Sequence, residues 1–390
     1  MEEAPDHEIL LTPAPYAHFT LKEALEQPES LARALNYGAR LNGDRVVLGG
    51  LDNHRKELLN VHNLLITGCG TSKYASELGS KIMRDLEAFD SVSVLDSAEV
   101  RTTDIPKVDG CVLAVSQSGE TKDVVRALAC AENKGVLTMS VVNAVGSLIA
   151  RKTGLGCYLN AGRENAVAST KAFSTQVVVM TLIGLWFQTL REETGGMGVK
   201  HHHNTHFRAD LMESLQRLPI SFGMARNQHP QCKRIAEELQ NKRHMFILGK
   251  GYGEPIAMEG ALKIKEMCYI HAEGYSGGAL KHGPFALIEG EDGSDGSTPV
   301  IMLILDDEHA HHMRTAAEEV KARGAKVYVI TDKRSLAKGI DDSPVVIPNN
   351  GPLTALTAVL PLQLIAYEIA LLKGINPDTP RNLAKAVTTD

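Results

Sequence analysis

Short runs of apolar residues alternate along the chain with stretches of helical periodicity. The first run, Asn63–Thr67 (NLLIT), has the length and composition of a buried strand, and Lys73–Leu86 after it carries apolar residues at helical spacing. The following elements continue the alternation: strands over Val92–Leu95 and Cys111–Val115, a helix over Thr121–Asn133 and a strand over Leu137–Val142. This alternation is typical of a parallel sheet covered by helices.

The same layout recurs in the second half of the chain. Residues 245–249 (MFILG) mirror the first strand, and Gly249-Lys250-Gly251 mirrors Gly68-Cys69-Gly70. The later elements follow in matching order: a helix over Ala257–Tyr269, a strand over Val300–Leu305, a helix over Arg314–Arg323 and a strand over Lys326–Ile330. Recurrence of a whole unit indicates two related domains side by side. The sequence therefore predicts an α/β fold of two subdomains, each a doubly wound parallel sheet flanked by helices.

Composition narrows the classes of partner. The 390 residues are 43% hydrophobic and 23% charged, as in ordinary globular proteins. The net charge of -6 argues against a nucleic-acid partner, because duplex binders usually carry a basic face. No stretch approaches the roughly 20 consecutive apolar residues of a membrane span. The acidic start MEEAPDHE lacks the features of a signal peptide, so we expect neither a membrane nor a secretory protein.

The cysteine pattern points to a reducing compartment. Six cysteines are scattered without a C-x-x-C pair: Cys69, Cys111, Cys130, Cys157, Cys232 and Cys268. Buried free thiols are the simplest interpretation of such a distribution. We therefore expect a cytoplasmic protein without structural zinc and without a cofactor.

Two segments interrupt the alternation of strands and helices. Thr194–His206 (TGGMGVKHHHNTH) is predicted to be an exposed connection leading into a helix. Its four histidines could bind a metal, but adjacent positions project in different directions and no carboxylate cluster accompanies them, which favours a solvated linker. Glu289–Thr298 (EGEDGSDGST) is acidic and rich in Gly and Ser, which predicts a surface loop.

The most informative local feature is a hydroxyl-rich turn after a strand. Ser116, Gln117, Ser118 and Thr121 follow an apolar run and open a helix. The free N–H groups of a helix start, together with neutral side-chain donors, can bind a phosphate without a lysine or arginine. Gly70-Thr71-Ser72 closes the earlier strand, and both loops should lie at the carboxyl ends of parallel strands, where α/β folds bind ligands.

The alternative is that these hydroxyls only cap helices, as single Ser and Thr residues often do. Two such loops in corresponding places favour the phosphate. The second half provides a contrast, because Leu305-Asp306-Asp307 stands where the first half has its hydroxyls, and its carboxylates would repel a phosphate. The sequence therefore predicts one phosphate site per chain.

Six motifs together resemble the isomerase domain of glutamine:fructose-6-phosphate aminotransferase. They are C-G-T-S at 69–72, S-Q-S-G-E-T at 116–121, V-A-S-T-K-A at 167–172, K-I-K-E at 263–266, L-K-H-G-P at 280–284 and P-R-N-L-A-K at 380–385. They come in the family's order and span nearly the whole chain. The resemblance implies two sugar-isomerase (SIS) subdomains. It divides the chain into a lead-in at 1–44, SIS subdomains at 45–205 and 206–370, and a catalytic tail at 371–390.

The resemblance also implies roles for individual residues. The substrate-binding set comprises Thr71, Ser72, Ser116, Gln117, Ser118, Thr121, Val167, Ser169 and Ala384, of which Val167 and Ser169 would line the sugar. Lys385 would form an imine with the sugar carbonyl, and Glu266 would move a proton between C1 and C2 with Lys263 beside it. His282 would open the sugar ring from the neighbouring subunit, which implies a homodimer.

Taken without the resemblance, the catalytic candidates have ordinary interpretations. A lysine near the end of a tail is usually a surface residue. Lys263 and Glu266 share a helix face and could be a surface ion pair. His282 lies in a Gly/Pro turn and could serve only as a hydrogen-bonding group. An imine-forming lysine must also be unprotonated when it attacks, which its ordinary pKa of about 10.4 disfavours.

Three features depart from the family pattern. The family carries an N-terminal glutaminase with a cysteine nucleophile, whereas this chain has no cysteine before Cys69, so we expect ammonia to come from elsewhere. Ala279 replaces the glutamate of G-E-L-K-H-G. In the loop Gly162–Ala166, Glu164 is kept but Arg163 and Asn165 differ, which could alter the sugar pocket.

Three functions remain open at this stage. The first is conversion of fructose 6-phosphate to glucosamine 6-phosphate with supplied ammonia, or to glucose 6-phosphate. The second is a related aminosugar-phosphate deaminase or deglycase, against which the synthase-like tail P-R-N-L-A-K counts. The third is a sugar-phosphate sensor without catalysis, which would have no use for Lys385.

Overall fold

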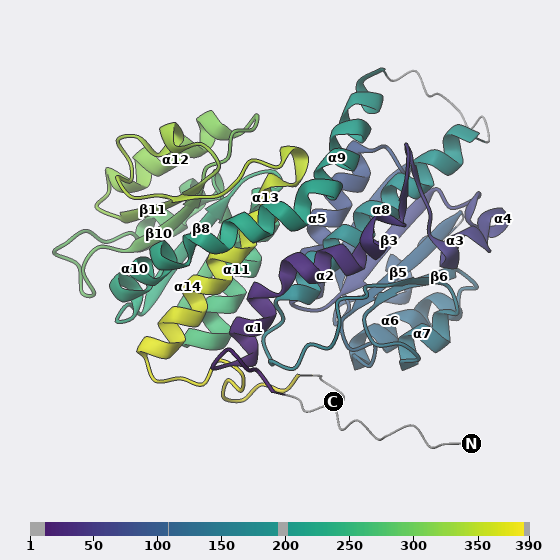
Figure 1. The fold of residues 1–390 in the computed structure, drawn as a ribbon, viewed down its shortest axis with the longest axis horizontal. Helices are drawn as coiled ribbons and strands as arrows, with labels where there is room; N and C mark the ends of the chain where they lie inside the picture. Colours follow the sequence, from purple (N-terminus) through teal and green to yellow (C-terminus); the bar gives the residue numbers. More distant parts are fainter. Residues whose placement is uncertain (1–11, 108, 194–201, 386–390) are drawn as a thin grey trace.

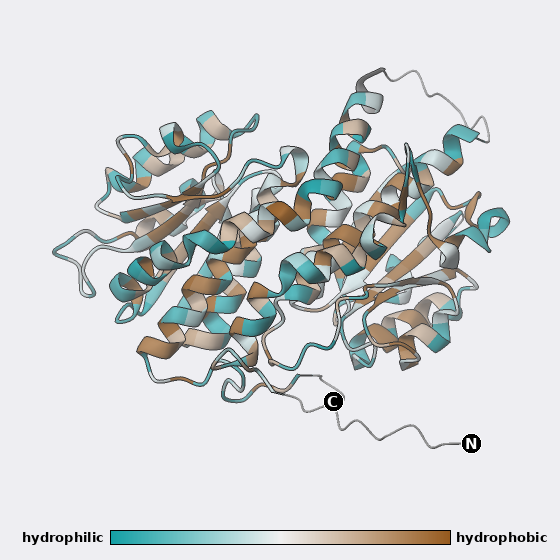
Figure 2. Cartoon of the chain, in the orientation of Figure 1, coloured by the Kyte–Doolittle hydropathy of each residue, from teal (hydrophilic) through white to brown (hydrophobic). Residues whose placement is uncertain are grey.

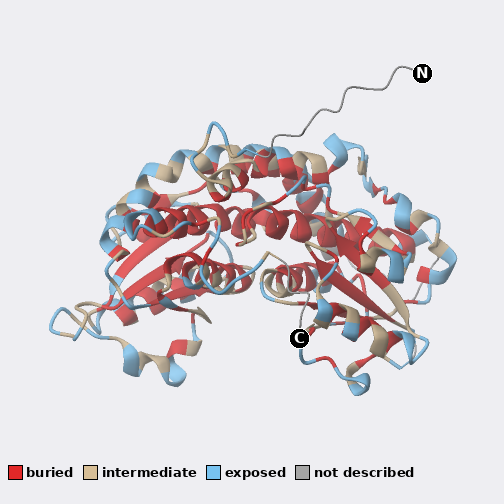
Figure 3. Cartoon of the chain, turned by 90° about the horizontal axis from the view of Figure 1, so that it is seen from below, coloured by how far each residue is buried: buried red, intermediate tan, exposed pale blue. Residues whose placement is uncertain are grey.

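Two five-stranded parallel sheets, one from each half of the chain, form the framework of the protein (Figure 1). The computed structural model describes residues 12–107, 109–193 and 202–385. Long helices fill the space between the two sheets, and shorter helices cover their outer faces. The most apolar segments are the sheet strands and the central helices (Figure 2), and these are also the buried parts (Figure 3).

The first sheet has the strand order β4-β3-β5-β6-β7. Its strands are β3 (Asn63–Gly68), β4 (Ser91–Asp96), β5 (Gly110–Ser116), β6 (Leu137–Val142) and β7 (Gly156–Tyr158). The helices of this half are α5 (Thr71–Asp85), α6 (Lys122–Glu132), α7 (Leu148–Thr153) and α8 (Lys171–Glu193). β3 pairs with the edge strand β4 on one side and the central strand β5 on the other, so the loops after β3 and β5 leave neighbouring strand ends.

The second sheet repeats this arrangement in the order β12-β11-β10-β8-β9. Its strands are β8 (His244–Gly249), β9 (His271–Ser276), β10 (Pro299–Leu303), β11 (Lys326–Thr331) and β12 (Val345–Val346). The helices of this half are α10 (His229–Leu239), α11 (Gly253–Cys268), α12 (Ala310–Lys321), α13 (Thr354–Thr357) and α14 (Val359–Leu372). The two orders correspond strand for strand, so the predicted pair of α/β subdomains with doubly wound parallel sheets is confirmed.

The two halves are joined through helices. α5 packs against α8 and also against α11 of the second half, and α14 packs against α10 and α11. The N-terminal helices α1 (Phe19–Leu25) and α2 (Gln27–Ala34) lie across the junction together with α9 (His202–Ala225), as Figure 1 shows. The small elements are β1 (Leu41–Asn42), β2 (Arg45–Val46), α3 (Gly49–Asp52) and α4 (Arg55–Leu58). One apolar core runs through both halves.

Two helical segments have the length and hydropathy of a membrane span. They are Lys171–Glu193, with a mean hydropathy of 1.4, and Gly351–Leu372, with 1.8. Their most apolar windows are 100% and 89% buried within the chain, as is usual for core helices of an α/β protein. Periodicity did not predict α8, because it is buried on every side from Lys171 to Leu190 and so has no polar face.

The two segments that interrupt the alternation of strands and helices agree only in part with their predictions. Residues 194–201 lie outside the described residues, and α9 already begins at His202, so the helix starts earlier than the predicted connection over Thr194–His206 allows. His206, on this helix, is exposed. Glu289–Thr298 forms a loop before β10, as predicted, and the loop is pinned by the backbone bond from Thr298 N–H to the Glu289 carbonyl (2.9 Å).

Candidate active site

The hydroxyl loop, residues 116–121, connects the end of β5 to α6. Ser116 is buried, and its Oγ accepts the N–H of Gly119 (3.0 Å) and lies 3.0 Å from the Thr121 Oγ1. Ser118 Oγ accepts the N–H of Glu120 (3.2 Å). Gly119 has a positive φ of 68°, and a Cβ there would lie 2.0 Å from Ser147 Oγ, so this turn requires glycine. The loop is therefore held in one shape by its own hydrogen bonds.

A second turn lies beside the hydroxyl loop. Gly70, at a φ of 53°, leads from β3 into α5, which begins with Thr71 and Ser72. Ser72 is buried, and its Oγ accepts a hydrogen bond from the Gln176 side chain on α8 (2.8 Å). Because β3 and β5 are neighbours in the sheet, both turns lie at the same edge. Doubly wound sheets bind ligands at the carboxyl ends of such neighbouring strands, and this is where the phosphate site is predicted.

The corresponding edge of the second sheet is lined by carboxylates. The Asp306 N–H donates to Asp332 Oδ1 (2.8 Å), and the Lys333 ammonium donates to Asp306 Oδ2 (2.9 Å). Burial raises the pKa of Asp307 above its ordinary value. A cavity of about 850 Å³ opens here, lined on its far side by Lys81 and Arg84 of α5. The hydroxyls of the first half have no counterpart in this turn.

Helix α11 presents a row of charged side chains to the start of α5. Glu259, Lys263 and Glu266 are spaced by four and three residues, so they share one face. Lys263 Nζ lies 2.5 Å from Glu266 Oε2 and 3.5 Å from Glu259 Oε1. It also donates to Thr71 Oγ1 (3.1 Å), and Thr71 donates to Glu259 (3.3 Å). Thr71 thus ties the first half of the chain to the charged row of the second half.

In this set of side chains, which we call the α11 row (Glu259, Lys263 and Glu266), the pKa values of Lys263 and Glu259 depend on how deeply each side chain is buried. Lys263 and Glu259 have fully buried side chains, whereas 21% of the Glu266 side chain is exposed. Burial alone would lower the pKa of Lys263, but Glu259 and Glu266 outweigh it and raise that pKa. Burial raises the pKa of Glu259 to about 8, against which Lys263 acts. Lys263 is therefore a fixed positive charge, and Glu259 can hold a proton near neutrality.

The pKa of Glu259 leads to a testable dependence of stability on pH. Between the unfolded pKa of 4.5 and the folded value of about 8, the folded chain binds the extra proton, so the free energy of unfolding falls as pH rises. A Glu259→Gln variant stays neutral and escapes this loss. We expect its melting temperature to match the wild type near pH 5 and to exceed it by roughly 4 °C at pH 8.5. Thermal unfolding across this range, with the exposed Glu291→Gln as control, measures the difference, and a constant offset at all pH values would contradict it.

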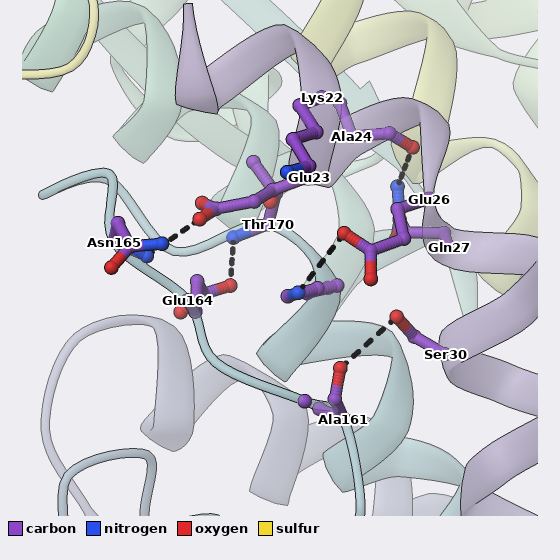
Figure 4. A network of polar contacts seen from close by, with 12 residues as sticks. Lys22, Glu23, Ala24, Glu26, Gln27, Ser30, Ala161, Glu164, Asn165 and Thr170 are labelled. Atoms are coloured by element: carbon purple, nitrogen blue, oxygen red, sulfur yellow. Dashed lines mark hydrogen bonds and ion pairs between the residues drawn. The ribbon is translucent and has the colours of Figure 1, made fainter. Parts of the chain in front are cut away.

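The C-terminal tail brings Lys385 to the loop before α8. Lys385 Nζ lies 2.6 Å from Glu164 Oε2 and 3.5 Å from Ser169 Oγ. The Glu164 side chain is fully buried, and its other oxygen accepts the N–H groups of Thr170 (2.9 Å) and Ala172 (3.1 Å) at the start of α8 (Figure 4). The tail is anchored further along the same loop, where the Val167 N–H donates to the Asp378 carbonyl (3.0 Å).

Glu164 is the electrostatic partner of the tail lysine. Burial would raise its pKa, but the charge and hydrogen bond of Lys385 and the two N–H groups from α8 outweigh burial and hold that pKa below the ordinary value. Glu164 also contributes to raising the pKa of Lys263. Glu164 is therefore the group whose charge acts on both the tail lysine and Lys263 of α11.

The structure brings most of the predicted residues together. Thr71, Lys263 and Glu266 are in direct contact, as are Lys385 and Ser169, and the Ser72 and Ser116–Thr121 turns share one sheet edge. The Lys263–Glu266 pair is largely buried rather than on the surface. Ala384 and His282 are exposed, His282 at the end of the 3-10 helix Ala279–His282. In the part of the chain that the structure describes, His282 forms no hydrogen bond or ion pair with these groups.

One site residue, Glu259, was not predicted from the sequence, and another, Glu164, was named there without a role. Glu259 stands four residues before Lys263, a spacing that places it on the same helix face and could have identified it. Glu164 stands out in the sequence only as an acid before V-A-S-T, and its contact with Lys385 joins residues 221 positions apart. Among the side chains that the structure describes, those of residues 12–107, 109–193 and 205–385, no group of three or more His, Cys, Asp or Glu is placed to hold a metal. All six cysteines are free.

Comparisons with known proteins agree with the fold of two subdomains. The SIS domain family matches residues 57–185 and 238–373, one segment around each sheet. The chain is 36% identical over 381 residues to the glutamine–fructose-6-phosphate aminotransferase (isomerizing) of Chlorobaculum tepidum and 38% identical over 383 residues to that of Pyrococcus horikoshii. In both cases 96% of this chain is covered, and the chain spans 59% and 58% of the length of these relatives.

A solved structure extends the similarity to three dimensions. The C-terminal domain of glucosamine-fructose-6-phosphate aminotransferase from Francisella tularensis is 30% identical to the chain, with a TM-score of 0.83. The match covers 94% of this chain and 99% of that domain. The paired sheets and the edge that carries the hydroxyl loop therefore belong to a known architecture.

Proposed function

The chain belongs to the SIS domain family, and from this premise we propose that it is a sugar-phosphate isomerase acting on fructose 6-phosphate. With supplied ammonia the product is glucosamine 6-phosphate; without ammonia it is glucose 6-phosphate. The observation that carries the proposal is the contact of Lys385 with Glu164 and Ser169, which brings a nucleophile from the C-terminal tail to the half of the chain that carries the hydroxyl loop. The free cysteines favour a cytoplasmic location.

The phosphate is assigned to the two turns at the edge of the first sheet. Ser72, Ser116, Gln117, Ser118 and Thr121 offer neutral donors there, and the start of α6 adds backbone N–H groups and its dipole. Thr71 links this turn to Lys263, so a phosphate bound there lies beside the α11 row. Val167, Ser169 and Ala384 are assigned to the sugar, on the loop and tail that carry Glu164 and Lys385.

The chemistry follows from the ketone at C2 of the open-chain sugar. The unprotonated Nζ of Lys385 attacks C2, and loss of water leaves an iminium. Ammonia then adds to C2 and releases the lysine amine, giving the sugar imine. Glu266 removes a proton from C1 and returns it to C2, while the proton of the C1 hydroxyl passes to the imine nitrogen, which produces the C1 aldehyde and the C2 amine. Without ammonia, release of the lysine by water and the same proton transfer give the aldose.

His282 is assigned to opening of the sugar ring, and its place supports a dimer. Its side chain is exposed and, within the described residues, forms no hydrogen bond or ion pair with the site residues of its own chain, so we assign it to the site of a second copy. The homodimer is thus part of the proposal. The neighbouring Lys281 donates a hydrogen bond to Glu319 (2.8 Å). Position 279, where the family has a glutamate, is alanine in this chain.

The hydroxyl loop can be tested by Ser118→Ala. Ser118 is half-buried, and its only hydrogen bond in the described structure is to the Glu120 N–H, which leaves the hydroxyl proton available to a ligand. Loss of one hydrogen bond to a charged phosphate should raise KM for fructose 6-phosphate by about 10-fold with little change in kcat. The exposed Ser335→Ala is the matched control. A lower kcat at unchanged KM would contradict the assignment to phosphate binding.

The proposed function is tested by incubating the full chain with fructose 6-phosphate, with and without ammonium, and identifying the sugar phosphates formed. We expect glucosamine 6-phosphate with ammonium and glucose 6-phosphate without it. Ammonia release from added glucosamine 6-phosphate with no formation from fructose 6-phosphate would replace the proposal by a deaminase. Binding of fructose 6-phosphate without any turnover by a folded dimer would replace it by a sensor.

A further inference from the structure

The N-terminal helix α1 contacts the loop that carries Glu164. Glu23 on α1 is 1% exposed, and its carboxylate accepts the N–H groups of Asn165 (2.5 Å) and Ala166 (3.3 Å). Figure 4 shows the Glu23 carboxylate reaching down from α1 to Asn165, next to Glu164 on the same loop. A charged acceptor that holds two consecutive N–H groups fixes the backbone of that loop at this point.

The same helix also contacts the tail that carries Lys385. The Asp378 carboxylate accepts the N–H groups of Phe19 (2.9 Å) and Thr20 (2.7 Å) and the Thr20 hydroxyl (2.7 Å). These N–H groups lie in the first turn of α1, where a helix has no internal partners and favours a negative charge. The tail is therefore fastened to α1 a few residues before Lys385.

The loop and the tail are joined directly by the bond from Val167 N–H to the Asp378 carbonyl (3.0 Å). Helix α1, the 164–169 loop and the 378–385 tail thus form a closed ring of contacts, which we call the α1 ring. On the loop, Glu164 directly precedes Asn165, and on the tail, Lys385 follows Asp378. The side chains of Glu164 and Lys385 bond to each other at 2.6 Å.

We propose that Glu23 and Asp378 are positioning residues. Through them the N-terminal helix α1 belongs to the active site and fixes the position of Lys385 relative to Val167 and Ser169. The proposal rests on the function proposed above. Neither residue needs to touch substrate. Glu23 holds the backbone of the loop, and Asp378 holds the tail against α1. Lys385 and the sugar-lining residues are thereby placed around the same carbonyl of the substrate.

The electrostatic surroundings of Glu23 give this role a pH dependence. Burial, then the charge of Glu164, raises the pKa of Glu23 to about 7, while the Asn165 N–H and the ammonium groups of Lys171 and Lys385 act in the opposite direction. Above pH 7 the ionised carboxylate accepts both N–H groups. Below it the neutral acid resembles a glutamine and holds them more weakly.

The test compares the full-length wild type with Glu23→Gln and with Glu29→Gln, an exposed glutamate on α2. We expect Glu23→Gln to lower kcat by about 10-fold at pH 8 with KM changed by less than about 3-fold, because the phosphate turns are untouched. At pH 6 the difference in kcat from the wild type should shrink to about 2-fold. Hydrogen–deuterium exchange of the Asn165 and Ala166 amides should speed up, and Glu29→Gln should match the wild type throughout.

Two results would overturn the proposal. Unchanged exchange at Asn165 and Ala166 would show that Glu23 does not hold the loop, whatever the activity. Faster exchange with kcat equal to the wild type at both pH values would make the α1 ring purely structural. Asp378→Asn provides a second variant with the same expected loss of kcat should Glu23→Gln fold poorly. A wild type that turns over no sugar phosphate refutes the proposed function instead, and the exchange measurement still reports on the ring.

Discussion

Replacement of Lys385 by alanine is expected to lower kcat for fructose 6-phosphate by roughly 1,000-fold or more, because the variant has no amine to attack the C2 carbonyl. The effect should be on kcat rather than on substrate binding, since the turns at 71–72 and 116–121 do not contact the tail lysine. The Glu164 carboxylate would lose its cationic partner, which costs some stability of its own.

Lys385→Arg separates the chemical role from the structural one. An arginine keeps the positive charge beside Glu164, but a guanidinium stays protonated and cannot form an imine. Steady-state assays should find Lys385→Arg as inactive as Lys385→Ala, with a melting temperature closer to the wild type. The exposed Lys338→Ala serves as the control for loss of a lysine. Activity of Lys385→Arg within 10-fold of the wild type would mean that charge, not nucleophilicity, is what the reaction uses.

The Glu266→Gln variant is expected to lose about 100- to 10,000-fold in kcat, the usual range for removal of a general base. Glutamine fills the same space and can still accept the hydrogen bond of Lys263, so the helix face should stay intact. What it removes is the ability to take a proton from C1. The variant should therefore still bind fructose 6-phosphate with a KM near the wild-type value.

Exchange of the C1 proton with solvent reports on this step directly. In D2O the wild type should incorporate deuterium into sugar phosphate, and Glu266→Gln should not. Glu237→Gln, an exposed glutamate on α10, is the matched control. Deuterium incorporation by Glu266→Gln at the wild-type rate would assign the base to another group, and Glu259, about two turns away on the same helix face, would be the first to examine.

The fold could be predicted because its signals are local. Apolar runs such as Asn63–Thr67 and the repeated glycine turns depend on neighbouring residues, and they predicted the two parallel sheets. The order of the strands within each sheet, and the strands β7, β9 and β12, come from the structure alone. Helices α8 and α14 were not found, because a helix buried on all sides has no alternation of polar and apolar faces. The apolar residues of α8 lie on all sides of the helix and show no helical periodicity in the sequence. These same residues fill the core.

The residues of the candidate site likewise fall into those that the sequence predicted and those that only the structure identified. The hydroxyl loop and the Lys263–Glu266 pair lie within a few positions in the sequence, so spacing alone placed each on one turn or one helix face. The contact of Lys385 with Glu164, and those of Glu23 and Asp378 with loop and helix, join segments that only the tertiary fold brings together. No periodicity could reveal them. Local motifs therefore give the reacting groups, and the fold gives the residues that hold them in place.

The halves of the chain are unequal in function although they are alike in architecture. The first sheet ends in hydroxyl turns, and the second ends in Asp306 and Asp307. The second half instead contributes α11 and the tail, which meet the first half at Thr71 and at the Glu164 loop. The proposed reaction thus takes place where the two subdomains join, with phosphate binding on one side and the α11 row on the other.

Borohydride trapping tests the central claim, the imine at Lys385, most directly. The full chain is mixed with fructose 6-phosphate and reduced, and the C-terminal peptide is analysed by mass spectrometry, with Lys385→Arg as control. We expect one hexose phosphate joined to Lys385 through a reduced C–N bond in the wild type, and none in the control. An unmodified Lys385 in a preparation that turns over fructose 6-phosphate would contradict it.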